Sequence, residues 1–196
     1  SQEDGFAEHL STRGDNLPLV ANFLFEHHPD AFARILEAMK ARVPGVSLVE
    51  PRQTEDGRLV LRFQDGSFKD PFVARHVSDG TIKMFAYLVL LNDPQPYPLL
   101  AVEEPENQLY PELLPELAEE FRSYAQRGGQ VFISSHSPDF LNALKLEEIY
   151  CLRKVQGFTQ ISRAAESANL QALVDAGDLP GALWKRGLLE LSLIHI

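Results

Sequence analysis

The chain contains a short apolar run that ends in two adjacent carboxylates: Leu99-Leu100-Ala101-Val102-Glu103-Glu104-Pro105-Glu106. Four consecutive apolar residues predict a buried strand, and the proline directly after the acids ends it. Two like charges at the end of a buried strand repel each other and resist desolvation, so such a pair usually binds a cation. We therefore expect a functional site at this strand end.

A second run of the same kind follows in Gln130-Val131-Phe132-Ile133-Ser134-Ser135-His136. It begins with residues typical of a buried strand and ends in polar groups. In an open α/β sheet, the carboxyl ends of neighbouring strands form the crevice in which ligands bind. If the two strands are neighbours, Glu103, Glu104 and His136 converge on one place.

The composition is that of a soluble globular protein. The 196 residues are 44% hydrophobic and 23% charged, which suffices for one sizeable core with an appendage. No stretch approaches the roughly 18–20 apolar residues of a membrane span, and the first residues lack the pattern of a signal peptide. The single cysteine, Cys151, excludes an internal disulfide and fits a reducing compartment. We expect a cytoplasmic protein that does not bind membranes.

The net charge of −10 argues against nucleic-acid binding by this chain, because phosphate contacts need clustered Lys and Arg. We expect no DNA binding by this part of the protein.

Apolar periodicity predicts helices first, then a hairpin, then alternating strands and helices. Helices are expected over about 17–28, 30–42, 78–91, 111–126, 166–175 and 180–189, with a short one after Ser137, and strands over 46–52, 58–63, 72–75, 99–103, 130–135, 148–154 and 158–163. Pro115 is expected to bend or shift the start of the helix over 111–126, and Gln156-Gly157 to turn the last hairpin. Asn16, Asp30 and Ser137 are expected to cap helices. This order predicts an α/β fold with a partly parallel sheet and flanking helices.

Ser78-Asp79-Gly80-Thr81 begins one of these helices and has two interpretations. Free backbone N–H groups at a helix start, with the helix dipole behind them, suit a phosphate oxygen. The alternative is an ordinary N-cap by Ser78, and the four residues alone favour that alternative.

The two strand ends also leave alternatives open. A carboxylate such as Glu103 can hold Mg²⁺ through its water shell, and its neighbour Glu104 can polarise an attacking water. The alternative is a turn that carries solvated acids. A neutral imidazole at His136 could donate to a γ-phosphate or to that water, although a single histidine at a strand end is more often only a cap.

Taken in order, these pieces resemble a known family. Val77-Ser78-Asp79-Gly80-Thr81 resembles the signature loop of the ATP-binding-cassette (ABC) ATPases, in their soluble branch with the SMC and RecF-like proteins and the AAA-21 ATPases. The run from Leu99 to Asn107 resembles the Walker B strand and D-loop, and Ile133-Ser134-Ser135-His136-Ser137-Pro138 resembles the switch-histidine loop. The resemblance extends from about residue 70 to 145, and more weakly over residues 178–184.

This resemblance implies a role for each matching residue at the strand ends. Glu103 takes the place of the acid that holds Mg²⁺ through water, where Asp is usual. Glu104 takes the place of the general base or water-orienting acid, and His136 that of the sensor of the γ-phosphate.

In the signature loop, Ser78 and the Gly80 amide are implied to contact the γ-phosphate of ATP held by an opposing subunit. Asp79 and Thr81 belong to the same nucleotide-binding loop. Asp79 replaces the Gly of the transporter signature, and its negative charge favours the helix start.

The sequence contains no Gly-x-x-x-x-Gly-Lys-Ser/Thr motif (Walker A), which in the family precedes all of these motifs. We therefore expect the C-terminal lobe of a P-loop NTPase head of ABC type, inactive alone. Residues 1–66 would be a helical pair and β-hairpin insertion, and residues 67–190 the lobe with the four motifs. Residues 191–196 form an apolar tail for which we make no prediction.

The resemblance implies that the full-length protein hydrolyses ATP with Mg²⁺ between two head-to-tail copies and drives a partner. A nuclease or a DNA-handling module, in a DNA-related or defence-related task, would be such a partner. Two alternatives remain open. The chain could be a non-catalytic lobe that completes a site on another chain, or a metal-dependent hydrolase that uses Glu103, Glu104, Glu106 and His136 as ligands.

Overall fold

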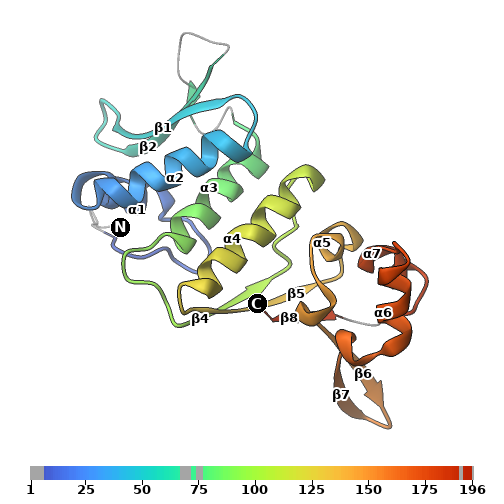
Figure 1. Cartoon of the computed structure of the whole chain (residues 1–196). Helices are drawn as coiled ribbons and strands as arrows, with labels where there is room; N and C mark the ends of the chain where they lie inside the picture. Colours follow the sequence, from blue (N-terminus) through green and yellow to red (C-terminus); the bar gives the residue numbers. More distant parts are fainter. Residues whose placement is uncertain (1–6, 67–71, 74–76, 190–191, 196) are drawn as a thin grey trace. The chain divides into compact units, whose positions relative to one another are not determined.

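The computed structural model of the chain describes residues 7–66, 72–73, 77–189 and 192–195 (Figure 1). The chain forms two compact units, Ser1–Pro96 and Tyr97–Ile196. The boundary predicted at residue 66 adjoins residues 67–71, which lie outside the described part, and it stays a prediction. No helix in the described part is both long and apolar enough to cross a membrane.

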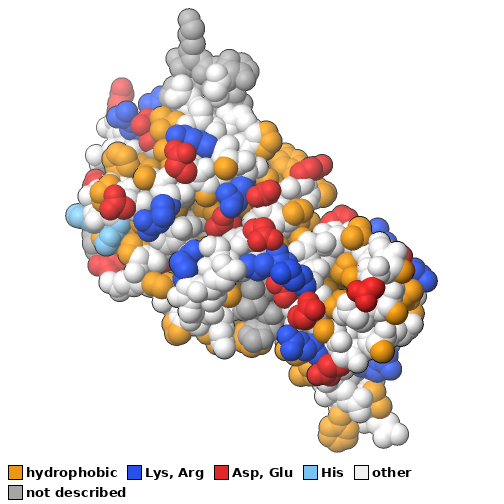
Figure 2. All heavy atoms as spheres, in the orientation of Figure 1, with side chains coloured by type: hydrophobic (Ala, Val, Ile, Leu, Met, Phe, Trp, Pro, Cys, Tyr) orange, Lys and Arg blue, Asp and Glu red, His pale blue; other side chains and the backbone are white. Residues whose placement is uncertain are grey.

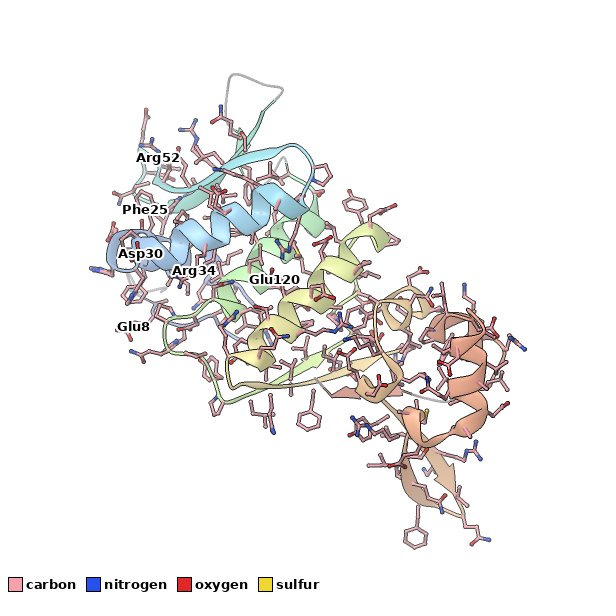
Figure 3. All side chains as sticks on the ribbon, in the orientation of Figure 1. Glu8, Phe25, Asp30, Arg34, Arg52 and Glu120 are labelled. Carbon is pink, nitrogen blue, oxygen red and sulfur yellow. The ribbon has the colours of Figure 1, made fainter. Side chains whose placement is uncertain are left out.

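The first unit packs helices against a small antiparallel sheet (Figure 1). Its elements are α1 (Leu17–His27), α2 (Pro29–Arg42), β1 (Val46–Gln53), β2 (Leu59–Asp65), β3 (Phe72–Val73) and α3 (Asp79–Leu91), with the strands in the order β1-β2-β3. The core between helices and sheet includes Phe63 and Phe85, whose rings meet edge to face at 5.9 Å. Phe25 on α1 is 51% exposed and its ring lies 5.4 Å from that of Phe32 (Figure 3).

Two predicted helix caps in this unit are wrong. Asn16 occupies the position before α1, but its side chain makes no capping hydrogen bond. It accepts from the Ser11 N–H at 2.9 Å and donates to the His9 carbonyl at 2.9 Å, so it closes the preceding loop instead. Asp30 lies inside the first turn of α2, which begins at Pro29 because proline is suited to the first helical position.

The second unit is built on a five-stranded sheet with the order β4-β5-β8-β6-β7. Its elements are β4 (Leu99–Glu103), α4 (Leu114–Gln126), β5 (Gln130–Ser135), α5 (Pro138–Asn142), β6 (Ile149–Val155), β7 (Phe158–Arg163), α6 (Ala168–Asp175), α7 (Pro180–Lys185) and β8 (Ser192–His195). β4 and β5 are parallel, and the other pairs are antiparallel. The backbone of residues 192–195, for which no prediction was made, therefore forms a strand between β5 and β6.

The local turn signals of this unit are mostly confirmed. A 3₁₀ turn over Pro111–Leu113 precedes α4, as expected from a proline at position 115 that cannot donate a helical hydrogen bond. Gln156 and Gly157 turn the β6–β7 hairpin with positive φ angles of 49° and 88°, which is the geometry of a tight two-residue hairpin turn. This hairpin carries exposed hydrophobic side chains (Figure 2), Phe158 at 78% exposure among them.

The last helix is shorter than predicted. α7 ends at Lys185 rather than near residue 189. Gly187 adopts a positive φ of 74°, and the Leu188 N–H donates to the Leu183 carbonyl at 3.0 Å. A left-handed glycine combined with this bond is a common helix stop, and Leu188 and Leu189 therefore lie beyond the helix.

Candidate functional site

Parallel pairing of β4 with β5 brings the two predicted strand ends together. The register aligns Glu103 with Ser134, and the Glu104 N–H continues the pairing by donating to the Ser134 carbonyl at 2.9 Å. Glu104 and His136 therefore leave the sheet at the same edge. The condition set by the sequence, that these strands be neighbours, is met.

The Glu104 carboxylate has a partner for each of its oxygens. Oε1 is in hydrogen-bonding contact with Nε2 of His136, and Oε2 accepts a hydrogen bond from Nδ2 of Asn107 at 2.7 Å. The bond from Asn107, and after it the one with His136, lowers the pKa of Glu104 below its ordinary value of 4.5. The two side chains of the pair are open to solvent, with exposures of 33% for Glu104 and 52% for His136. The site therefore presents an ionised carboxylate and an imidazole to a ligand.

The backbone that carries Glu104 is a tight turn. Glu104 and Gln108 adopt left-handed φ angles of 44° and 66°, which cost about 1–3 kcal/mol each for residues other than glycine. The Asn107 N–H donates to the Glu104 carbonyl at 3.1 Å, and the Leu109 N–H donates to the Glu106 carbonyl at 3.0 Å. Backbone strain of this kind is common at functional sites, which supports the interpretation of this turn as part of the candidate site.

A second contact joins the same turn to β5. The Ser135 hydroxyl donates to Oε1 of Glu106 at 2.7 Å, and its oxygen accepts from the Ser137 N–H at 3.1 Å. Ser135 was not among the predicted site residues. The alternation of β5 carried the signal, because Ser135 falls on the face of Val131 and Ile133, and a buried hydroxyl needs a hydrogen-bond partner.

Glu103 ends β4 as an exposed side chain, on the face of the strand opposite to Val102. Within the described part of the chain, no group of three or more His, Cys, Asp or Glu side chains is placed to hold a metal ion. A protein-only metal centre therefore has no support there. Mg²⁺ is compatible with this donor set, since it keeps several waters and often binds one or two carboxylates together with substrate phosphates.

The predicted signature loop belongs to the first unit, whereas Glu103, Glu104 and His136 belong to the second. Ser78 is the N-cap of α3: its Oγ accepts from the Thr81 N–H at 3.2 Å and lies 2.8 Å from the Thr81 hydroxyl. Gly80 and Thr81 are buried, and Asp79 is exposed in the first turn. The N-cap interpretation of Ser78 is thus confirmed, and nucleotide contact by this loop stays a prediction.

Comparison with known proteins identifies the family. The family described as "AAA domain, putative AbiEii toxin, Type IV TA system" (AAA_21) matches residues 2–142. None of the curated proteins matches the chain.

Solved structures share the fold at low sequence identity. A structure from work on ATP-driven dimerization and DNA-stimulated activation of SMC ATPases has a TM-score of 0.58 at 12% identity, over 81% of this chain and 98% of that one. The Smc head with an extended coiled coil, bound to the C-terminal domain of ScpA from Pyrococcus furiosus, has a TM-score of 0.57 at 12% identity, over 80% and 40%. An Smc head bound to the C-winged helix domain of ScpA has 0.52 at 13% identity, over 82% and 51%.

This chain thus spans 40% and 51% of the two Smc chains that were solved with ScpA. Because the family match covers most of the sequence and the fold is that of SMC ATPase heads, the chain belongs to the AAA_21 family and forms an ABC/SMC-like ATPase lobe of the P-loop NTPase fold.

Proposed function

We propose that the full-length protein hydrolyses ATP with Mg²⁺ and that this lobe supplies the carboxylate and the histidine of the reaction. The observation that carries the proposal is the contact between Glu104 and His136 at the carboxyl ends of two parallel strands. In α/β sheets this edge is where ligands bind. The membership of an AAA family and the SMC-head fold support a nucleotide as that ligand.

Each side chain has a role that follows from its chemistry. Glu104 is ionised and held in place by Asn107. It orients the attacking water and acts as the general base that accepts a proton from it. His136 contacts that carboxylate through Nε2, and it would donate to the γ-phosphate by exchanging this contact for a phosphate oxygen. Glu103 would hold Mg²⁺ through water, and the ion would neutralise charge on the phosphates.

We further propose that the loop over residues 78–81 acts on ATP held by a second copy of the protein. The start of α3 offers backbone N–H groups and the positive end of the helix dipole, which favour an anion. The first of the SMC structures comes from work on ATP-driven dimerization, and this supports a head-to-tail homodimer here. The driven partner would be a nuclease or a DNA-handling module, and the location would be the cytoplasm.

The sequence has no Gly-x-x-x-x-Gly-Lys-Ser/Thr motif. Residues outside this sequence would therefore bind the α- and β-phosphates of ATP, and the chain alone should not hydrolyse ATP. The missing motif is also compatible with a second function, in which the chain is a non-catalytic lobe that completes a site on another polypeptide.

The test is Mg-ATP hydrolysis by the product of the whole gene, beside Glu104→Gln and the control Glu112→Gln, which alters an exposed carboxylate of the following 3₁₀ turn. We expect Glu104→Gln to bind ATP, to lose at least about a hundredfold in kcat and to accumulate as a nucleotide-bound dimer. Glu112→Gln should behave as wild type.

If neither the wild type nor Glu104→Gln binds ATP, the proposal fails. Co-purification of a second, Walker-A-bearing chain that restores hydrolysis would then favour the non-catalytic lobe.

A further inference from the structure

Two contacts connect the turn after β4 with the loop that carries His136. One is the direct contact between Oε1 of Glu104 and Nε2 of His136. The other runs through Ser135, whose hydroxyl donates to Oε1 of Glu106 at 2.7 Å. Glu104 and Glu106 share one hydrogen-bonded turn, so both contacts attach the His136 loop to the same piece of backbone.

The two contacts differ in how firmly they can hold. The Glu104–His136 pair is exposed, and exposed ion pairs contribute little because water and salt screen them. Ser135 is only 1% exposed. A buried hydrogen bond is electrostatically stronger, and losing one partner leaves the other unsatisfied. The Ser135–Glu106 bond is therefore the firmer of the two.

Ser135 also holds the backbone on the far side of His136. Its oxygen accepts from the Ser137 N–H at 3.1 Å, and Ser137 in turn caps α5 by accepting from the Phe140 N–H at 3.3 Å. The residues before and after His136 are thus both tied to one hydroxyl. The orientation of that hydroxyl is set by Glu106, since the hydroxyl proton points to the Glu106 carboxylate.

The Glu106 carboxylate is held at an energetic cost. Its second oxygen, Oε2, is buried and accepts no hydrogen bond from the described residues. A buried unpaired oxygen is unfavourable, and such groups in folded proteins call for an explanation beyond local stability. A requirement to orient Ser135 supplies one.

We propose that Glu106 is a positioning residue for hydrolysis: through Ser135 it fixes the loop that presents the His136 imidazole to Glu104. This inference rests on the proposed ATPase function. In this role Glu106 acts through Ser135 and not on the substrate. It keeps Glu104 and His136 aligned, because their direct contact is exposed to solvent and holds them only weakly.

The test compares variants of the full-length protein in Mg-ATP hydrolysis. Glu106→Ala and Ser135→Ala should each lower kcat by about ten- to hundredfold with KM within about twofold of wild type, because misplacement acts on the reacting geometry. The double variant should be no slower than the slower single variant, since both changes remove one link. Glu112→Ala, at an exposed glutamate nearby, should leave both constants unchanged.

Glu106→Gln is the conservative variant. Its amide oxygen can still accept the Ser135 hydroxyl, so kcat should return to within about threefold of wild type. Equal losses in Glu106→Gln and Glu106→Ala would overturn the proposal, and so would losses that multiply in the double variant. If Glu106→Ala does not fold, the kcat values of Glu106→Gln and Ser135→Ala still test the positioning role of Glu106.

Amide hydrogen exchange of the segment 134–141, measured without nucleotide, separates this proposal from the ATPase proposal. Ser135→Ala and Glu106→Ala should speed exchange in this segment, whereas Glu106→Gln and Glu112→Ala should not. Unchanged exchange in the two former variants contradicts the positioning role. A wild type that does not hydrolyse ATP contradicts the proposed function and leaves the exchange result to stand alone.

Discussion

The imidazole of His136 contacts the carboxylate of Glu104 although the two residues lie 32 positions apart in the chain. Parallel pairing of β4 and β5 in a single register brings them together. A one-residue slip of a strand would turn its side chains to the other face of the sheet. The contact therefore depends on the register as much as on the two residues.

His136→Gln in the full-length protein should lower kcat for Mg-ATP by about a hundredfold, because a positioned proton donor typically contributes 10²–10⁴-fold. ATP binding, followed by a fluorescent nucleotide, should change little. His27→Gln alters an exposed histidine at the end of α1 and serves as the control. A His136→Gln protein as active as this control would remove His136 from the reaction.

Substitution of Ser78 separates its capping role from a phosphate contact. Ser78→Ala should destabilise the protein by about 1 kcal/mol, since Oγ no longer accepts from the Thr81 N–H. Ser78→Asp should keep the cap and the stability, because Asp caps as well as Ser. Its negative charge should nevertheless suppress ATP hydrolysis if this loop meets a phosphate.

Thermal unfolding and steady-state hydrolysis measure the two effects separately. Wild-type hydrolysis by Ser78→Asp would show that the loop is a helix cap only.

Glu148 should make stability depend on pH. Burial raises its pKa, but the hydrogen bonds from Arg122 at 2.6 and 2.8 Å and from the Lys145 N–H at 2.8 Å outweigh burial, and the pKa falls below the ordinary 4.5. A carboxyl with a lowered folded pKa stabilises the protein above its unfolded pKa. That contribution disappears as the pH falls through the folded value.

Glu148→Gln should therefore lower the free energy of unfolding by about 3 kcal/mol near neutral pH, because it removes the carboxylate that accepts two hydrogen bonds from the largely buried Arg122 and leaves only the exposed Glu119 as its charged partner. The difference from wild type should shrink below about pH 4. Denaturant titrations at both pH values measure it, with Glu147→Gln at an exposed neighbour as the control. A difference that stays constant with pH would contradict the assignment.

Gly181 should tolerate no side chain. A Cβ there would lie 2.0 Å from the Pro138 carbonyl oxygen and 2.6 Å from Oδ1 of Asn142, which already accepts from the Gly181 N–H at 2.8 Å. Gly181→Ala must push α7 away from α5, at a cost of about 1–3 kcal/mol. Gly66→Ala, where the nearest atom is 3.8 Å from the added carbon, is the matched control in thermal unfolding. Equal melting temperatures of the two variants would refute this close contact.

Local features of the sequence were enough to predict most of the elements and several of their ends, but not the strand β8. The β4 and β5 strands, the N-caps Ser78 and Ser137 and the turn at Gln156 are decided by residues a few positions apart, whose preferences act without the rest of the fold. Asn16 shows the limit of such reasoning. Its side chain could cap α1 or bond to the preceding loop, and in the structure it bonds to the Ser11 N–H and the His9 carbonyl of that loop.

The composition of the site was also present in the sequence, as acids and a histidine at the ends of two apolar runs. The tertiary structure alone decided that these runs are parallel neighbours, that Glu104 meets His136, and that Glu106 reaches Ser135. The physical reason is that strand partners and register depend on the free energy of the whole core, which contacts between distant residues determine. The residue pattern indicates which groups are available for a site, but the pairing of the strands determines which of these groups are in contact.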